Sequence, residues 1–228
     1  HLTQADGELM QSNWKTVFGA SILAANPGTD GQLVCVTEGG DTFLLSANEI
    51  TTGGFRARSE QQLKLPDNMS EPLQAVAVSE GRIAVWTNGP DGKLWVIGPS
   101  ALAQAEVPLA QALDCPPIRF SGGALLPIPG RLKLARAGTP VCDDFLAPIN
   151  TANEGPVRKW KHLIAVDDDT LFVIDSVGKM SKLQYRTGEK TFFQTVSSVD
   201  FTQPIDVAPT LHKGKLLTAD AAGTMHVT

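Results

Sequence analysis

The sequence has few of the features that mark common functional classes. It has three cysteines but no CxxC pair, and neither an HExxH nor a GxSxG motif. These absences leave no zinc-site spacing and no metalloprotease or hydrolase signature. It also has no run of Lys or Arg, and its 228 residues carry a formal net charge of -5. Because nucleic-acid binders present a basic stripe, we expect no nucleic-acid partner.

Long apolar runs are missing as well. No apolar stretch reaches the roughly 18 residues that a membrane-spanning helix needs, so we expect no membrane-spanning segment. Residues 1–13 lack the basic start and apolar core of a signal peptide. The first residue is His1 rather than Met, so we expect either a processed chain or a segment of something longer.

The composition that is present indicates a packed, turn-rich protein. Hydrophobic residues make up 42% of the chain and charged residues 19%, which favours a globular core over disorder. The 21 glycines and 15 prolines are many for a helical protein and typical of a β protein with many turns. The length permits one large domain or two small ones.

A repeat runs through the whole chain. Each unit has an apolar run, a turn with glycine, and a second apolar segment, and the spacing between units is 42–50 residues. The first run is apolar at successive positions, as in a strand buried on both faces. The second segment alternates, as in a half-covered strand. We expect the turn glycines to supply the positive φ of tight hairpins: Gly40, Gly92, Gly130, Gly178 and Gly223.

Further predicted strands flank each pair. A short apolar segment precedes it, as at 73–78 and 162–166, and a more polar one follows, as at 55–63 and 190–196. Four strands in 40–50 residues are typical of a propeller blade. We therefore predict an all-β fold, a β-propeller of four-stranded antiparallel blades with about five blade units. A β-sandwich is the alternative, but it would not repeat a four-strand unit five times.

We predict one propeller domain over residues 1–228, or a five-unit segment of a larger propeller. The predicted units cover 19–66, 72–113, 116–150, 157–203, and 204–228 together with 9–18. The last unit stops at its third strand, and the segment from Leu9 resembles a fourth, so the two would complete one blade and close the ring. Segment 100–113 is either a short helix or a loop and a strand.

The repeat resembles the PQQ-type propeller repeat of quinoprotein alcohol dehydrogenases and outer-membrane assembly lipoproteins. The residues that carry the resemblance are the turn from Asp175 to Gly178, the strand from Met180 to Tyr185, and the Thr-Gly-Glu-Lys run that ends at Lys190. The resemblance implies the propeller fold, usually with seven or eight blades. Phe192 stands near the place where the family usually has a Trp that docks one blade on the next.

The same resemblance implies a quinone site only if its ligands are present. Quinone-binding members use a vicinal Cys-Cys disulfide, a Trp under the quinone, and carboxylate and amide ligands to calcium. Here Cys35, Cys115 and Cys142 are never adjacent. PQQ and calcium therefore belong only to an alternative interpretation, and we expect no cofactor.

The cysteines and the acidic run are interpreted as structural residues. Cys35 is expected to be a small buried side chain. Cys115 and Cys142 are either unpaired thiols or a disulfide, which would suit an extracytoplasmic protein. The run Asp167–Asp169 is read as a turn that caps backbone N–H groups, with a cation site as the alternative. We assign no catalytic, cofactor-binding or metal-binding residue.

Histidine and tryptophan add no catalytic signature. The histidines at 162 and 226 are expected to pack in or beside strands, and His212 to lie in a turn. Trp86 either packs between blades or approaches the central channel. The other indoles are Trp14, Trp95 and Trp160, and the Asn68 sequon is formally a glycosylation acceptor.

These patterns favour a non-catalytic propeller scaffold that presents loops to a protein partner, located outside the cytoplasm in the periplasm or as a secreted protein. The alternatives are a PQQ-dependent oxidoreductase, or a fragment of one, and a glycan-binding propeller. The first alternative rests on fold analogy. The second needs two suitably spaced carboxylates at one mouth of the channel.

Overall fold

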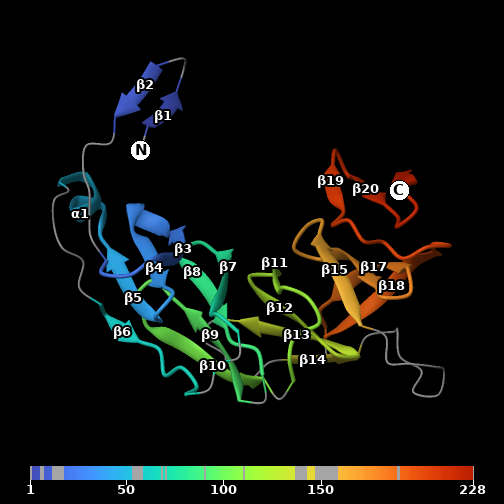
Figure 1. The fold of residues 1–228 in the computed structure, drawn as a ribbon, viewed down its shortest axis with the longest axis horizontal. Helices are drawn as coiled ribbons and strands as arrows, with labels where there is room; N and C mark the ends of the chain where they lie inside the picture. The colour runs from blue at the N-terminus through green and yellow to red at the C-terminus, as the bar shows by residue number, and fades with distance from the viewer. Residues whose placement is uncertain are drawn as a thin grey trace.

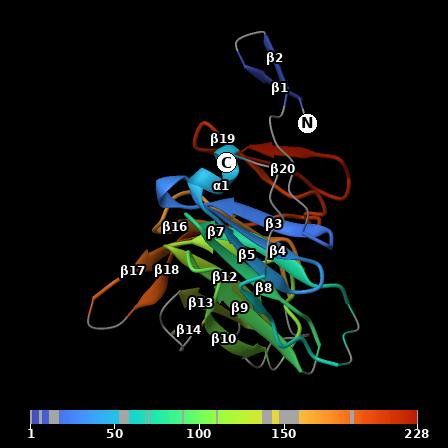
Figure 2. The ribbon, with the colours of Figure 1, turned by 90° about the vertical axis from the view of Figure 1, so that its left-hand side faces the viewer.

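The fold consists of β-sheets that follow one another around an arc (Figures 1 and 2). This computed structural model describes residues 2–5, 8–11, 18–52, 59–67, 69, 71–89, 91–109, 111–136, 143–146, 159–188 and 191–227. Four of the sheets have four strands, and within each the strands are hydrogen-bonded in chain order and antiparallel. The prediction of an all-β fold built from four-stranded antiparallel propeller blades is confirmed.

The strands of the first two sheets are β3 (Ile22–Pro27), β4 (Leu33–Thr37), β5 (Asp41–Leu45) and β6 (Gln61–Gln62), then β7 (Gln74–Ser79), β8 (Arg82–Trp86), β9 (Gly92–Ile97) and β10 (Ala103–Leu109). Those of the third are β11 (Ile118–Phe120), β12 (Gly123–Ile128), β13 (Arg131–Arg136) and β14 (Asp143–Leu146). The fourth has β15 (Trp160–Ala165), β16 (Thr170–Asp175), β17 (Lys179–Arg186) and β18 (Phe192–Asp200). In the described residues the fifth has three, β19 (Thr210–His212), β20 (Lys215–Ala219) and β21 (Met225–Val227).

The hydrophobic core lies in the seams between successive sheets. The second strand of a sheet contributes side chains to the seams on both sides of that sheet, because its side chains alternate between the two faces. In β8, Ile83 and Val85 pack in the seam with the first sheet, while Ala84 and Trp86 pack in the seam with the third. Successive positions are therefore all buried, which explains the continuous apolar run in the sequence.

The turns between second and third strands follow the glycine prediction at four of its five positions. Positive φ occurs at 40, 130, 178 and 223, with values of 73–88°. The prediction for Gly92 is wrong, because the positive φ of that turn, 122°, belongs to Gly89. Gly92 begins β9, and a Cβ there would lie 2.7 Å from the carbonyl oxygen of Thr87. Close approach of the backbone, rather than φ, therefore requires this glycine.

A buried side-chain oxygen caps the same turns. Asp175 Oδ1 accepts hydrogen bonds from the backbone N–H groups of Val177 (3.0 Å) and Lys179 (2.8 Å). Asp220 Oδ1 does the same two and four residues later, at 3.0 and 2.9 Å. Thr37 and Thr87 accept one such bond each, both at 3.1 Å. The aspartate in the resemblance motif thus satisfies turn donors, as Asx-turns do.

The structure decides between the two predicted forms of segment 100–113 and adds two short helical elements. Segment 100–113 is not a helix: it is a loop followed by β10, the second of the two predicted forms. A helix not predicted, α1 (Ala47–Thr52), follows β5, and a single 3-10 turn, η1 (Thr29–Gly31), follows β3. Ser46 and Glu49 cap α1 reciprocally through side chain to backbone bonds, with Ser46 N–H to Glu49 Oε2 at 2.8 Å. Over the described ranges, no helix is both long and apolar enough to span a bilayer.

The N-terminal hairpin does not settle how the last sheet is completed. Its strands, β1 (Leu2–Ala5) and β2 (Glu8–Gln11), pair with each other and stand apart from the other sheets in both overall views. The predicted fourth strand of the last blade begins at Leu9, and its residues 12–17 lie outside the described part of the chain. Its pairing with β21 stays a prediction.

Candidate functional site

The loops that lead into the innermost strands gather at one end of the sheets. In an antiparallel sheet, the start of the first strand, the end of the second and the start of the third lie at the same end. Segments 111–117 and 201–209 therefore share this end, here called the front face, with the turns between second and third strands. The turns between first and second strands lie at the opposite end, the back face.

Segment 111–118 runs across the front face and lines three cavities in turn. It connects β10 to the innermost strand β11, which contacts the neighbouring inner strands β7 and β15. The cavities have volumes of about 250, 210 and 220 Å³. Cys115 and Pro116 belong to both the second and the third cavity. We call this surface, with its three cavities, the 111–118 surface.

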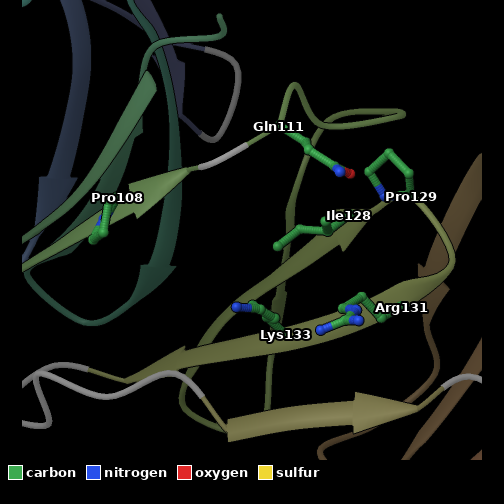
Figure 3. A pocket seen from close by; sticks show the side chains of 6 residues that line it. All are labelled: Pro108, Gln111, Ile128, Pro129, Arg131 and Lys133. Carbon is green, nitrogen blue, oxygen red and sulfur yellow. The ribbon is translucent and has the colours of Figure 1, made fainter. Parts of the chain in front are cut away.

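The first cavity lies between β10 and the hairpin β12–β13 (Figure 3). Figure 3 shows Arg131 and Lys133 extending from the same side of β13, as alternate residues of a strand must. Pro108 lies across from them on β10, and Gln111 reaches over the cavity from the loop. This end of the surface therefore carries two basic groups beside exposed proline and glutamine side chains.

The second cavity contains a buried acceptor without a partner. It is lined by Gln74 and Trp86 on one side and by Leu113–Pro116 on the other, with Asn88 at its edge. The Asn88 side chain donates to Glu71 Oε2 at 2.7 Å. Its Oδ1 is buried and accepts no hydrogen bond from the described residues. Because an unsatisfied buried acceptor is unfavourable, the cavity favours a group that brings a hydrogen-bond donor.

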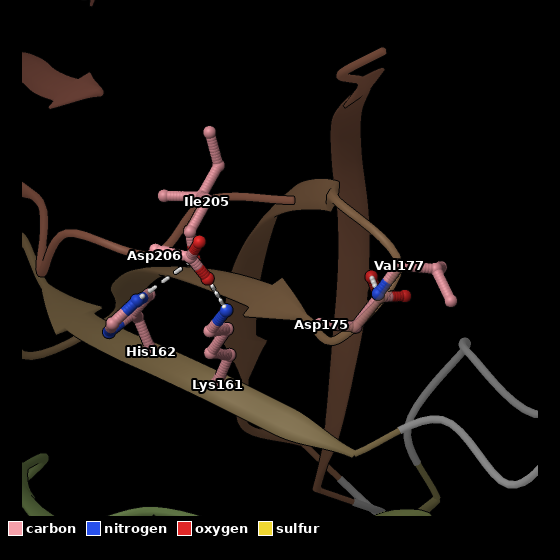
Figure 4. A network of polar contacts seen from close by, with 6 residues as sticks. All are labelled: Lys161, His162, Asp175, Val177, Ile205 and Asp206. Carbon is pink, nitrogen blue, oxygen red and sulfur yellow. Dashed lines mark hydrogen bonds and ion pairs between the residues drawn. The ribbon is translucent and has the colours of Figure 1, made fainter. Parts of the chain in front are cut away.

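The third cavity lies at the seam of the third and fourth sheets. It is lined by Cys115, Pro116 and Ile118, by residues 161–164, and by Ala208 and Pro209. Figure 4 shows how segment 205–206 is held there: Lys161 forms an ion pair with Asp206, and His162 Nε2 lies 3.3 Å from the carbonyl oxygen of Ile205. The Asp175 turn, with Val177, lies to the right of this network in Figure 4.

The surroundings of His162 favour its neutral imidazole. Burial disfavours the imidazolium and holds the pKa of His162 below its ordinary value, although the Ile205 carbonyl opposes this shift. A carbonyl oxygen can only accept, so Nε2 carries the proton of the neutral ring and donates it to Ile205. His162 therefore fixes the 201–209 loop, which agrees with the structural role predicted for it.

Trp160 anchors the 111–118 surface to the fold. Its side chain is 3% exposed, and its indole N–H lies within hydrogen-bond distance of the carbonyl oxygens of Ile128 (3.0 Å) and Arg131 (3.2 Å) in the third sheet. Its backbone N–H donates to Asp114 Oδ2 at 3.0 Å. Burial raises the pKa of Asp114, and this bond to Trp160 opposes the rise. The surface is thus built on a rigid joint between two sheets.

The cysteines occupy two different settings. Cys35 is fully buried in β4, as predicted, and burial raises the pKa of its thiol to about 11. Cys115 is a half-buried free thiol whose pKa is raised to about 12, by burial first and by the charge of Asp114 second. Cys142, its predicted disulfide partner, lies outside the described residues.

Both thiols are expected to react slowly in the folded protein. A raised pKa leaves the thiol protonated at pH 8, and only the thiolate is nucleophilic. In a Cys142→Ser variant, iodoacetamide at pH 8 should label Cys35 and Cys115 far more slowly than it does in urea, as followed by intact mass. Labelling of Cys115 at the rate of a free peptide thiol would contradict the burial described here.

The other predicted residues are structural. Asp167 Oδ1 accepts from the Asp169 N–H at 2.8 Å, so the acidic run caps the turn between β15 and β16, as predicted. Trp86 is buried in the seam of the second and third sheets, and Trp95 in that of the first and second. His226 lies 3.0 Å from Asp220. The prediction that His212 lies in a turn is wrong, because it is the exposed last residue of β19 and pairs with Lys215. Trp14 and Asn68 lie outside the described residues.

Sequence reasoning missed Asn88, Asp114 and the role of segment 111–118. The signal was the DCPP run from Asp114 to Pro117, directly before an innermost strand. Consecutive prolines make a stiff connection, and stiff loops on a rigid scaffold are where binding residues concentrate. Asn88 gave no signal of its own, because the cavity that it lines is formed by residues of two different units.

Comparison with known proteins supports the fold. No protein-family model matches the chain, and no curated protein matches it by sequence. Among solved structures, BamB from Moraxella catarrhalis matches 100% of this chain at a TM-score of 0.55 and 13% identity. The Myceliophteria thermophila Cps50 (Swd1) β-propeller domain matches 92% at 0.59 and 12% identity. BBS1N, solved in complex with ARL6DN, matches 90% at 0.50 and 15% identity.

In all three comparisons, this chain aligns with only part of the matched chain. The chain spans 64%, 65% and 62% of the three matched chains, respectively. At 12–15% identity they show that the chain has the β-propeller fold.

Proposed function

We propose that this chain is a PQQ-type repeat propeller that works as a non-catalytic scaffold and binds a protein partner on its 111–118 surface. The observation that carries the proposal is the row of three cavities along one anchored loop. Each is about 210–250 Å³, which is below the roughly 300–1,000 Å³ typical of small-molecule sites. Cavities of this size suit single side chains from a partner's loop.

Two further observations support a protein partner. The unpaired Asn88 Oδ1 favours an incoming donor, such as a backbone N–H. BBS1N, which shares the fold, was solved in complex with another protein. We also propose that the protein acts outside the cytoplasm, on the strength of the resemblance to periplasmic repeat proteins.

Site-specific crosslinking in native host cells tests the proposal. A photo-reactive amino acid at exposed Gln111 should capture one predominant protein, whereas the same group at exposed Gln194 on β18 should not. Pro116→Arg would fill two cavities from an exposed position and should abolish the crosslink. Ser198→Arg, an equal change on β18, should leave it intact. Equal capture at both sites, or capture that survives Pro116→Arg, would contradict the proposal.

The quinoprotein alternative does not fit the residues present. A vicinal disulfide cannot form, because the three cysteines are never adjacent. Across the described residues, no group of three or more His, Cys, Asp or Glu side chains is placed to hold a metal ion. We therefore derive no reaction step from the resemblance.

Added PQQ with calcium is expected to leave both the absorbance spectrum of the quinone and the Tm of the protein unchanged. The physical reason is linkage: only a ligand that binds the folded state raises its stability. A calcium-dependent rise in Tm with PQQ, absent with calcium alone, would favour the enzyme over the scaffold.

A further inference from the structure

A second cavity system lies at the back face, away from the 111–118 surface. Its volume is about 380 Å³, and its lining comes from three successive sheets: Thr29, Ser79, Glu80, Arg82, Pro99 and Arg119. Two arginines in one cavity would repel each other unless an anion lies between them. We propose that this cavity binds a carboxylate, held between Arg82 and Arg119.

The arginines are available to a ligand. Neither guanidinium forms an ion pair or hydrogen bond with any other described residue, and Arg82 Nε is buried without an acceptor. The hydroxyl of Ser79, in the same cavity, is also buried and unpaired. Leaving buried donors unpaired is unfavourable, so a ligand whose oxygens accept hydrogen bonds from these donors would bind favourably.

The cavity is pre-organised by the joint between the first and second sheets. Asn26 of β3 donates from Nδ2 to the carbonyl oxygens of both Ser79 and Arg82, the latter at 2.8 Å. Between these two residues, Gly81 N–H donates to the Pro27 carbonyl at 2.8 Å. Both ends of the β7–β8 turn are therefore held by another sheet, which lowers the ordering cost of binding.

Two glycines allow the turn to approach this closely. Gly81 has φ +61°, and a Cβ on it would lie 3.0 Å from Gly28 Cα. Arg119 reaches the same cavity from the other side, on innermost strand β11 of the third sheet. Residues 28, 81 and 119 are distant in sequence, so no motif marks the site.

Charge balance favours a carboxylate over a phosphate. Arg82 and Arg119 contribute two positive charges, and Glu80 in the same lining contributes one negative charge. One carboxylate would neutralise the remainder, whereas a phosphate dianion would leave an excess negative charge at the mouth of the cavity. A planar carboxylate also matches the fork of guanidinium donors.

The carboxylate has two sources that share this chemistry: a free carboxylic acid, or an acidic side chain on an extended peptide. Calorimetric titration at pH 7 and low salt, with butyrate in one arm and the single-carboxylate peptide N-acetyl-Ala-Glu-Ala-amide in the other, distinguishes them. Binding of either probe supports the site, and binding of the peptide alone assigns it to acidic peptides. Binding of inorganic phosphate alone, or of none of the three at millimolar concentration, would overturn the proposal.

Substitutions test whether Arg82 and Arg119 bind the carboxylate and whether Glu80 repels it. Arg119→Gln, at an exposed side chain, and Arg82→Gln should each weaken the bound probe by about tenfold or more. Glu80→Gln should tighten it, because a repelling charge is removed. Arg186→Gln, at an exposed arginine on β17, is the control and should change nothing. Equal affinity in the wild type and in Arg119→Gln would overturn the site, whatever the outcome for the front face.

Discussion

Trp160→Ala is expected to lower the free energy of unfolding by about 3–5 kcal/mol, the range for an aromatic side chain removed from a core. The indole is buried in the seam of the third and fourth sheets and also ties these sheets through two carbonyl groups. Its loss leaves a cavity and removes the N–H donor that the carbonyl oxygens of Ile128 and Arg131 share. Urea denaturation followed by far-UV circular dichroism measures the change.

A matched pair of phenylalanine variants separates packing from hydrogen bonding. Trp160→Phe keeps most of the ring volume but removes the N–H group, and should cost about 1–3 kcal/mol. Trp95→Phe removes the N–H that donates to Glu106 Oε2 at 3.0 Å. The Glu106 side chain is 46% exposed, so water can replace the lost donor. Trp95→Phe should therefore cost less. Equal losses for the two variants would show that the sheet-to-sheet bonds of Trp160 add little.

Gly178→Ala is expected to cost about 2–4 kcal/mol, since it combines backbone strain with overpacking. Gly178 has φ +88°, and a Cβ there would lie 3.0 Å from the Gln203 carbonyl oxygen and 3.3 Å from that of Phe201. The Phe201 N–H also donates to the Gly178 carbonyl at 2.9 Å. The added methyl group would therefore push away the segment that leads into the fifth sheet.

Gly223→Ala is the control, because Gly223 occupies the same repeat position with almost the same backbone. Its φ is +82°, and nothing lies within 4 Å of a Cβ built on it. Only the conformational penalty remains, about 1–2 kcal/mol. Chemical denaturation of both variants gives the difference. If the two changes cost the same, the contact with residues 201–203 does not constrain Gly178.

Much of the fold could be predicted because its signals are local. The unbroken apolar run of β8 follows from burial on both faces, and the glycine turns follow from the restricted φ of other residues. Gly92 shows where this reasoning fails, since its neighbour Gly89 takes the positive φ. Segment 100–113 shows the same limit: its sequence allowed a helix or a loop and a strand, and pairing with β9 makes Ala103–Leu109 a strand.

The candidate sites could not be predicted in the same way. Asn88 stands in a turn that reads as ordinary, and its unpaired oxygen belongs to a residue whose cavity is also lined by segment 113–116 of another unit. Arg82 and Arg119 lie in different repeat units, so nothing in the sequence indicates that they share a cavity. Even Trp160, visible as a large apolar residue, gains its two carbonyl partners from another sheet.

The repeated blade unit follows from the sequence, because strand alternation, turn glycines and capping aspartates act over a few neighbouring residues. What surrounds each repeat position depends on the packing of the sheets. Packing makes Gly178 crowded and Gly223 open, places three cavities along one loop, and brings two arginines to the same cavity. These contacts join side chains from different units, so no local pattern in the sequence contains them.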